Sequence, residues 1–149
     1  MNLIYIPNGR LLANNIIFMK LYTIKKRREF IKLQKEPSIK YSGKTTTILF
    51  RDTDEKYITN NQEQFIRIGI VATKKIDNRA VIRNKIKRRI REAIRKISKE
   101  TCNLFINHSD YELIAKKDFL DYKYQEIVSD LKDILQRVKI KYEQHKFYK

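Results

Sequence analysis

Residues Lys74–Lys99 read KKIDNRAVIRNKIKRRIREAIRKISK, and the strongest structural pattern of the chain lies in this stretch. At about 100° per residue its apolar residues fall on one stripe, which is typical of a helix with one buried face. The stripe consists of Ile82, Ile86, Ile90, Ala93, Ile94 and Ile97. The pattern predicts an amphipathic helix over Ile82–Ile97 that packs against a core.

The remaining surface of this helix is cationic, and only Glu92 interrupts it. Its basic residues are Lys85, Lys87, Arg88, Arg89, Arg91, Arg95 and Lys96, with Arg83 at the edge of the stripe. Like charges one turn apart repel each other, whereas each phosphate that they neutralise on a polyanion releases condensed counterions. Basic helix faces are often merely solvated, but this density of charge favours nucleic-acid binding.

The composition of the chain also favours nucleic-acid binding. The chain has 149 residues, of which 42% are hydrophobic and 34% charged, as expected for one folded domain. A net charge of +17 suits binding to RNA, DNA or an acidic membrane. The single cysteine excludes an internal disulfide, and no apolar run is long enough to cross a bilayer. Pro7, Gly9 and Arg10 interrupt the apolar N-terminus, so we expect no signal peptide, no membrane partner and a cytoplasmic location.

The segments around the basic helix predict a small sheet covered by helices. In order, we expect a helix at Ile24–Lys35, strands at Thr45–Arg51 and Phe65–Thr73, the basic helix, a strand at Tyr111–Lys116 and a helix at Tyr122–Tyr142. Gly69, within the second strand, indicates a bulge or a close approach of the backbone to another group. The order helix–strand–strand–helix–strand–helix predicts an α+β fold of two layers, in which the basic helix is a β-α-β crossover.

Three regions follow from this assignment. Residues 21–142 form a single RNA-binding domain, residues 1–20 are a poorly ordered N-terminal extension, and residues 143–149 are a tail that frays. Met19 is an alternative start, because the structured chain begins just after it.

The sequence contains no recognisable protein active site. His108 and His145 stand far apart, one cysteine cannot form a zinc site, and three glycines form no phosphate-binding loop. The carboxylates of Asp52–Gln64 could hold Mg²⁺, but they follow no fixed ligand pattern, so a solvated loop is favoured. We therefore expect no catalytic residue, and no metal or cofactor held by the protein alone.

The basic stretch resembles the signature of the bacterial ribonuclease P protein component. That family combines a strand ending in Ser/Thr/Ala-Lys-Lys with Arg-Asn-Arg and Ile/Val-Lys-Arg at the start of a basic helix, matched here by Thr73–Lys75, Arg83–Lys85 and Ile86–Arg88. Arg28–Phe30 resembles part of the family's first helix, and Tyr111–Lys116 resembles the strand after the basic helix.

The resemblance covers about Leu21–Val138 and shows two departures. Lys85 stands where the family usually has arginine, which keeps the charge but loses the planar bidentate fork. Asp77 or Asn78 replaces a glycine that often follows the two lysines.

The resemblance implies a ribonucleoprotein enzyme. A catalytic RNA uses Mg²⁺ to remove the 5′ leader of precursor tRNA, while the protein binds that RNA and holds the leader between its first helix and the sheet. It also implies a left-handed crossover, against the usual preference. The RNA-binding residues implied are Lys74, Lys75, Arg83, Asn84, Lys85, Lys87, Arg88, Arg89 and Arg91. The leader contacts implied are Arg27, Phe30 and Phe50.

Two of these assignments have structural alternatives. Aromatic rings beside a sheet suit unpaired bases, because stacking tolerates any sequence, but composition alone favours Phe30 as a core residue. Asn84 could offer its amide to RNA or could cap the basic helix.

Three other functions fit parts of the sequence. A ribosomal or assembly protein that binds structured RNA would share the charge and the missing active site. A protein-only nuclease would use the carboxylates of Asp52–Glu63. A helix-turn-helix protein would bind DNA, but the strands flanking the basic helix argue against it, so we expect no DNA partner.

Overall fold

A computed structural model describes residues 19–59 and 63–147. Its helices and strands are β1 (Lys20–Thr23), α2 (Arg27–Lys35), β2 (Ile39–Ser42), β3 (Thr46–Asp52), β4 (Phe65–Val71), α3 (Ala80–Glu100), β5 (Ser109–Ala115) and α4 (Tyr124–Phe147). Short 3-10 turns lie at Glu55–Tyr57, Cys102–Leu104 and Phe119–Asp121.

In the described part of the chain the sheet has five strands, in the order β1-β4-β5-β3-β2. β1, β4 and β5 are parallel, whereas β3 runs antiparallel to β5 and to β2. α3 joins the adjacent parallel strands β4 and β5, so the predicted crossover through the basic helix is confirmed. The α+β class is confirmed as well.

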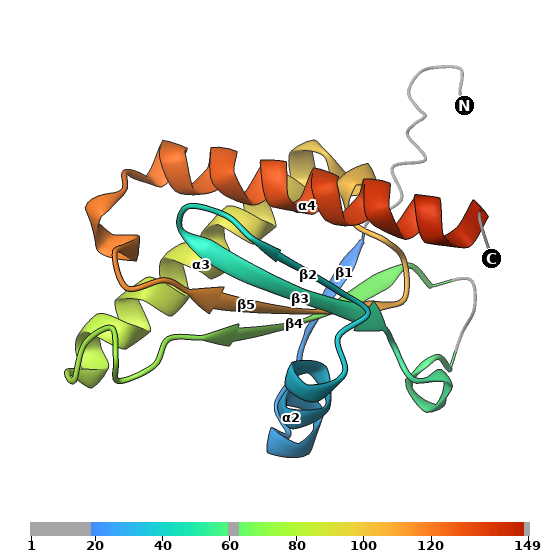
Figure 1. The fold of residues 1–149 in the computed structure, drawn as a ribbon, viewed down its shortest axis with the longest axis horizontal. Coiled ribbons are helices and arrows are strands. Elements are labelled where there is room, and N and C mark those ends of the chain that lie inside the picture. Colours follow the sequence, from blue (N-terminus) through green and yellow to red (C-terminus); the bar gives the residue numbers. More distant parts are fainter. Residues whose placement is uncertain (1–18, 60–62, 148–149) are drawn as a thin grey trace.

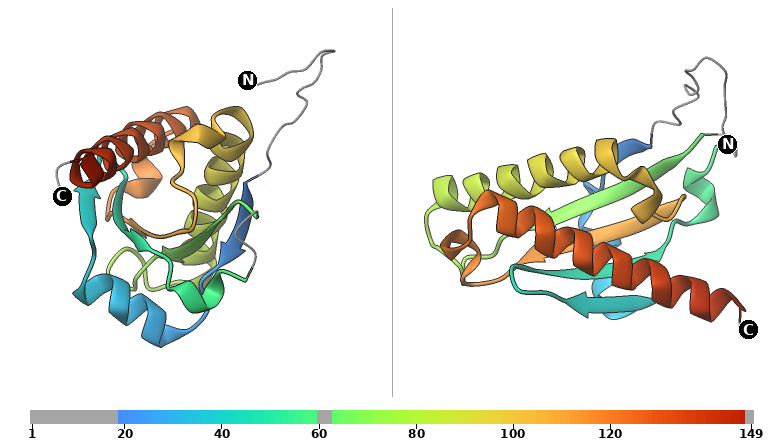
Figure 2. Two further views of the ribbon diagram at one scale, coloured as in Figure 1. Left: turned by 90° about the vertical axis from the view of Figure 1, so that its right-hand side faces the viewer. Right: turned by 90° about the horizontal axis from the view of Figure 1, so that it is seen from above.

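The helices divide between the two faces of the sheet. α3 and α4 lie side by side over one face, and α2 lies on the other (Figures 1 and 2). Successive residues of a strand point to opposite faces. In β4, Ile66 and Ile68 accordingly join the core under α3 and α4, while Arg67 pairs with Glu29 of α2 and Gly69 meets the ring of Phe30.

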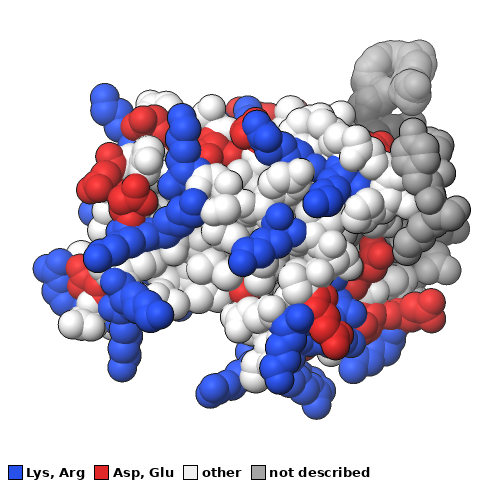
Figure 3. Space-filling model, in the orientation of Figure 1, with Lys and Arg blue, Asp and Glu red and all other residues white. Residues whose placement is uncertain are grey.

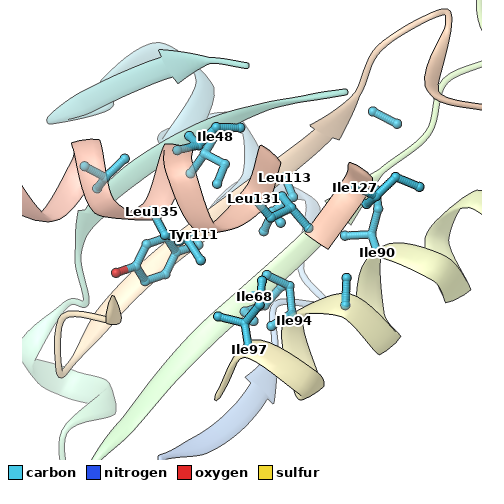
Figure 4. Close-up of a cluster of buried hydrophobic side chains, with 14 of the residues drawn as sticks. Ile48, Ile68, Ile90, Ile94, Ile97, Tyr111, Leu113, Ile127, Leu131 and Leu135 are labelled. Carbon is cyan, nitrogen blue, oxygen red and sulfur yellow. The ribbon is translucent and has the colours of Figure 1, made fainter. Parts of the chain in front are cut away.

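The main core fills the space between the sheet and the pair α3 and α4 (Figure 4). Ile86, Ile90, Ile94 and Ile97 of α3 are at most 2% exposed, which confirms the stripe predicted from their spacing. Each isoleucine buried in this way contributes roughly 1.5–3 kcal/mol to folding. Ile82, at the start of the stripe, is only half-buried.

Both edge strands were missed by sequence analysis. β1 has four residues, of which only Leu21 is half-buried, and β2 has four, of which only Ile39 is fully buried. Such short segments show no alternating pattern. They are strands because β4 and β3 provide backbone partners for them, and those partners lie elsewhere in the sequence.

Several predicted boundaries were wrong. α2 begins at Arg27 rather than Ile24, because the Ile24 N–H bonds to the carbonyl of Ile68 at 2.9 Å and prolongs the β1 pairing. Lys20, assigned to the extension, belongs to β1. α3 extends by two to three residues beyond Ile82–Ile97 at both ends, and α4 continues to Phe147. The rest of the predicted extension, residues 1–18, lies outside the described residues.

Candidate RNA interface

The cations of α3 line its surface over most of its length. Asn84, Lys85, Arg88, Arg91 and Arg95 are exposed, and Lys87 and Arg89 are half-buried. Within the described part of the chain, Lys96 is the one basic residue of α3 that forms an ion pair, with Glu100 at 3.3 Å. The other cations of the helix thus remain available for an anionic partner.

A cavity of about 210 Å³ lies where β1, α2, β4 and α3 meet, and we call it the α2–α3 cavity. Its apolar wall includes Phe30 of α2, Ile68 and Ile70 of β4, and Ile94 of α3. Its cationic wall is a row on α3, consisting of Lys87, Arg91 and Arg95. The cavity therefore combines apolar surface with three positive charges.

The cavity exists because β1 is short. β1 ends at Thr23, opposite Ile68, so the last three residues of β4 extend beyond it. The chain then turns away into α2, whose Phe30 ring lies against Gly69, where any Cβ would overlap the ring. The close approach predicted at Gly69 is therefore confirmed, and it lets Phe30 reach the cavity wall.

Spacing on the helix divides the basic residues of α3 into two groups. Lys87, Arg91 and Arg95 recur every fourth residue, so they share one side of α3 and line the cavity. Lys85 and Arg88 are exposed on α3 outside the cavity lining. Arg95 was absent from the predicted site, although its spacing from Lys87 and Arg91 could have identified it.

The three predicted leader contacts occupy different environments. Phe30 lines the cavity, whereas Arg27 is exposed at the first turn of α2 and does not line it. Phe50 is 0% exposed and packs edge-on against Tyr111 and Tyr142, with ring centroids 5.2 and 5.4 Å away. Because an enclosed ring offers no face to a base, the assignment of Phe50 to the leader was wrong. It faces the α3 and α4 layer of the core.

The loop between β4 and α3 is held by its own side chains. Asp77 accepts hydrogen bonds from the backbone N–H of Arg79 at 2.8 Å and from its guanidinium at 2.9 and 3.0 Å. These bonds lower the pKa of the Asp77 carboxyl to about 2. Arg83, predicted to bind RNA, donates from Nη1 to the carbonyls of Asp77 and Asn78 at 3.1 and 2.8 Å. Arg83 is half-buried, and these two hydrogen bonds hold the loop against the start of α3.

Lys74 and Lys75 are exposed at the exit of β4, as predicted from the sequence. Asn84 lies inside α3, because the N-cap position is Arg79, so of the two roles considered for Asn84 the structure excludes helix capping. Its exposed amide stays a predicted RNA contact.

A buried ionic group fastens α2 to the sheet. Arg67 pairs with Glu29 of α2 and with Asp110 of β5, and Tyr57 stacks on its guanidinium at 4.1 Å. Burial raises the pKa of the Asp110 carboxyl. For Glu29, burial opposes ionisation, but hydrogen bonds from Tyr57 and Arg67 bring its pKa below the ordinary value. These contacts fix the position of Phe30 above β4.

The loop carboxylates considered as Mg²⁺ ligands contact basic residues. Asp54 pairs with Lys32 at 2.9 Å, and Glu63 pairs with Lys20 at 3.1 Å and accepts a hydrogen bond from Tyr22 at 2.8 Å. Residues 19–59 and 63–147 contain no group of three His, Cys, Asp or Glu that could hold a metal ion.

Charge is unevenly spread over the face shown in Figure 3. Lys and Arg are scattered across it and around α2, while Asp and Glu gather at the lower right of the view and at the end where α4 begins. The acidic residues at that end are Asp118, Asp121, Glu126, Asp130 and Asp133. No helix of the described residues is long and apolar enough to cross a membrane.

Comparison with known proteins identifies the family. The sequence model of the family described as Ribonuclease P matches residues 18–139. The chain belongs to the ribonuclease P protein family. A ribonuclease P protein component from Gluconacetobacter diazotrophicus is 31% identical over 126 residues, which cover 82% of this chain and 95% of that protein. One from Streptococcus thermophilus is 33% identical over 84 residues, which cover 56% of this chain and 70% of that protein.

Solved structures agree with this membership. The ribonuclease P protein of Staphylococcus aureus superposes with a TM-score of 0.61 at 29% identity, covering 79% of this chain and 95% of that one. The protein from Thermotoga maritima gives a TM-score of 0.60 at 24% identity, covering 77% and 96%, and shows a shared fold. The family and fold expected from the basic stretch are both confirmed.

Proposed function

We propose that this member of the ribonuclease P family binds a catalytic RNA and the 5′ leader of precursor tRNA. In this role it assists the Mg²⁺-dependent endonucleolytic cut that produces the mature tRNA 5′ end. Its working location would be the cytoplasm, where precursor tRNA is processed. Family membership supports the ribonuclease assignment. The α2–α3 cavity supports the proposal that the protein binds the leader.

The cavity is the single observation that carries the leader assignment. It places the ring of Phe30 beside the cations Lys87, Arg91 and Arg95. Single-stranded nucleic acids are bound by this combination, because bases of any sequence stack on aromatic rings while cations follow the phosphates. Leaders differ in sequence from one tRNA to another, so a site without base-specific contacts suits them.

The cations outside the cavity would contact the catalytic RNA. Lys74 and Lys75 lie in the loop before α3, and Lys85 and Arg88 lie on the helix, all exposed. Structured RNA is recognised mainly by its backbone and shape, for which such a surface is suited. Asn84 and the half-buried Arg83 and Arg89 belong to the same proposed surface.

The chemistry would belong to the RNA. The carboxylates Asp54 and Glu63 contact lysines rather than one another, so they make a poor Mg²⁺ site. Mg²⁺ bound by the ribonucleoprotein would activate water and stabilise the leaving oxygen. The protein's share is to bind and orient the substrate, which requires no catalytic side chain.

The test is cleavage of precursor tRNA at low Mg²⁺ by a bacterial ribonuclease P RNA, with and without this protein. We expect accurate 5′ cleavage only when the protein is added, and none with the protein alone. Cleavage by the protein alone would support a protein-only nuclease. No effect with several such RNAs would favour the alternative of a structural RNA-binding protein without a processing role.

A further inference from the structure

The loop between β4 and α3 places a carboxylate among cations that are proposed to bind RNA. Asp77 follows Lys74 and Lys75 and precedes Arg79 and Arg83. On charge alone this carboxylate should repel a phosphate backbone and weaken binding. Its geometry suggests the opposite effect.

The side chain of Asp77 is turned inward. It is 20% exposed, whereas the side chain of its partner Arg79 is 71% exposed. Both carboxylate oxygens are engaged by Arg79, one of them also by the Arg79 backbone N–H. The negative charge is therefore neutralised locally, and the outer surface of the loop presents the arginine.

The same loop fixes Arg83. Its Nη1 bonds to the carbonyls of Asp77 and Asn78, so the guanidinium has a defined position only while the loop keeps its shape. A guanidinium has five N–H donors in a rigid fork. Within the described residues only Nη1 of Arg83 has hydrogen-bond partners, so its Nε and Nη2 hydrogens are left for a phosphate at the start of α3.

We propose that Asp77 is a positioning residue that strengthens RNA binding despite its charge, by holding this loop and through it Arg83. The inference rests on the proposed function of this surface. It assigns a role to a carboxylate that lies between the two lysines of the loop and the start of α3. A free loop would have to be ordered when the RNA binds, and Asp77 does this beforehand.

The experiment compares the affinity of a bacterial ribonuclease P RNA for the full-length wild-type protein and its variants. Asp77→Ala should bind about tenfold more weakly, since ordering the backbone of even one residue has a cost of this size. Asp77→Asn should lose less, because the amide oxygen can still accept the Arg79 N–H. Glu92→Ala removes the same charge from an exposed position of α3 and should bind equally well or more tightly.

A second measurement separates positioning from folding. Thermal unfolding should be nearly unchanged in Asp77→Ala, while amide hydrogen exchange at residues 77–83 becomes faster in the free protein. The inference is overturned if Asp77→Ala binds as tightly as wild type or more tightly. It is also overturned if the lost affinity only follows a smaller folded fraction.

Arg88→Ala distinguishes this inference from the proposed function. If wild type binds, Arg88→Ala binds more weakly and Asp77→Ala does not, only the role of Asp77 is refuted. If the wild-type protein does not bind the RNA, the proposed function fails and the role of Asp77 fails with it.

Discussion

Replacing Lys87, Arg91 and Arg95 together with alanine tests the α2–α3 cavity as the leader site. The three cations form its charged wall. If each lies beside one phosphate of a single-stranded leader, each adds about 0.7 to the slope of log affinity against log salt, or about 2 in total. Between about 50 and 200 mM salt, wild type should lose about 20-fold more affinity for the leader than the triple variant loses.

The assay compares two precursor tRNAs in the complete ribonucleoprotein, one with a long leader and one with a single leader nucleotide. Their difference in affinity isolates the leader, and its salt dependence is measured for wild type and variant. The control is Lys85→Ala with Arg88→Ala and Lys99→Ala, which removes three exposed cations of α3 outside the cavity lining. The control should leave the leader-dependent slope unchanged.

The triple variant should fold at least as well as wild type. Lys87 and Arg91, and likewise Arg91 and Arg95, are like charges one turn apart, and relieving each pair contributes roughly 0.2–0.5 kcal/mol to helix stability. A leader-dependent slope equal to that of wild type would refute the argument, and so would an equal loss of affinity for both substrates.

Four further variants test other parts of the structure. Gly69→Ala should destabilise the protein by roughly 1–3 kcal/mol, because the new methyl overlaps the Phe30 ring, and chemical denaturation measures this. Phe30→Ala should weaken leader binding by roughly 1–3 kcal/mol, whereas Phe50→Ala should cost about 3–5 kcal/mol of folding stability and change leader affinity only through the folded fraction. Burial raises the pKa of Glu112 above its ordinary value of 4.5, so the protein favours the neutral carboxyl and loses stability as pH rises through the raised pKa. Glu112→Gln should match wild type below about pH 4.5 and become relatively more stable toward neutral pH, and equal unfolding curves at both pH values would contradict this.

Local sequence was sufficient for features that depend on one segment. The buried stripe of α3 follows from the spacing of its isoleucines, because a helix places residues three and four apart on the same face. The close approach at Gly69 could be anticipated, since a glycine inside a strand leaves room for a neighbour, although the sequence did not show that the neighbour is Phe30. The density of lysine and arginine on α3 was enough to favour a polyanion as partner.

Features that depend on distant partners were not predictable in this way. β1 is a strand because it pairs with Phe65–Ile68, more than forty residues later in the chain, and its own four residues carry no pattern. Phe30 and Phe50 both lie among apolar and basic residues in the sequence. In the structure Phe30 lines the cavity, whereas Phe50 is buried in the core. This difference arises because the two rings pack on opposite faces of the sheet.

The residues of the site show the same difference between local patterns and contacts of distant segments. The amino-acid sequence was enough to identify a basic helix, its buried face and the family of the chain, because these depend on residue types at fixed local spacing. The cavity, the inclusion of Arg95 and the use of Arg83 to hold the loop depend on strand length, sheet order and hydrogen bonds between separate segments. Those relations exist only after the chain has folded, since they join residues that have no fixed distance from one another along the unfolded chain.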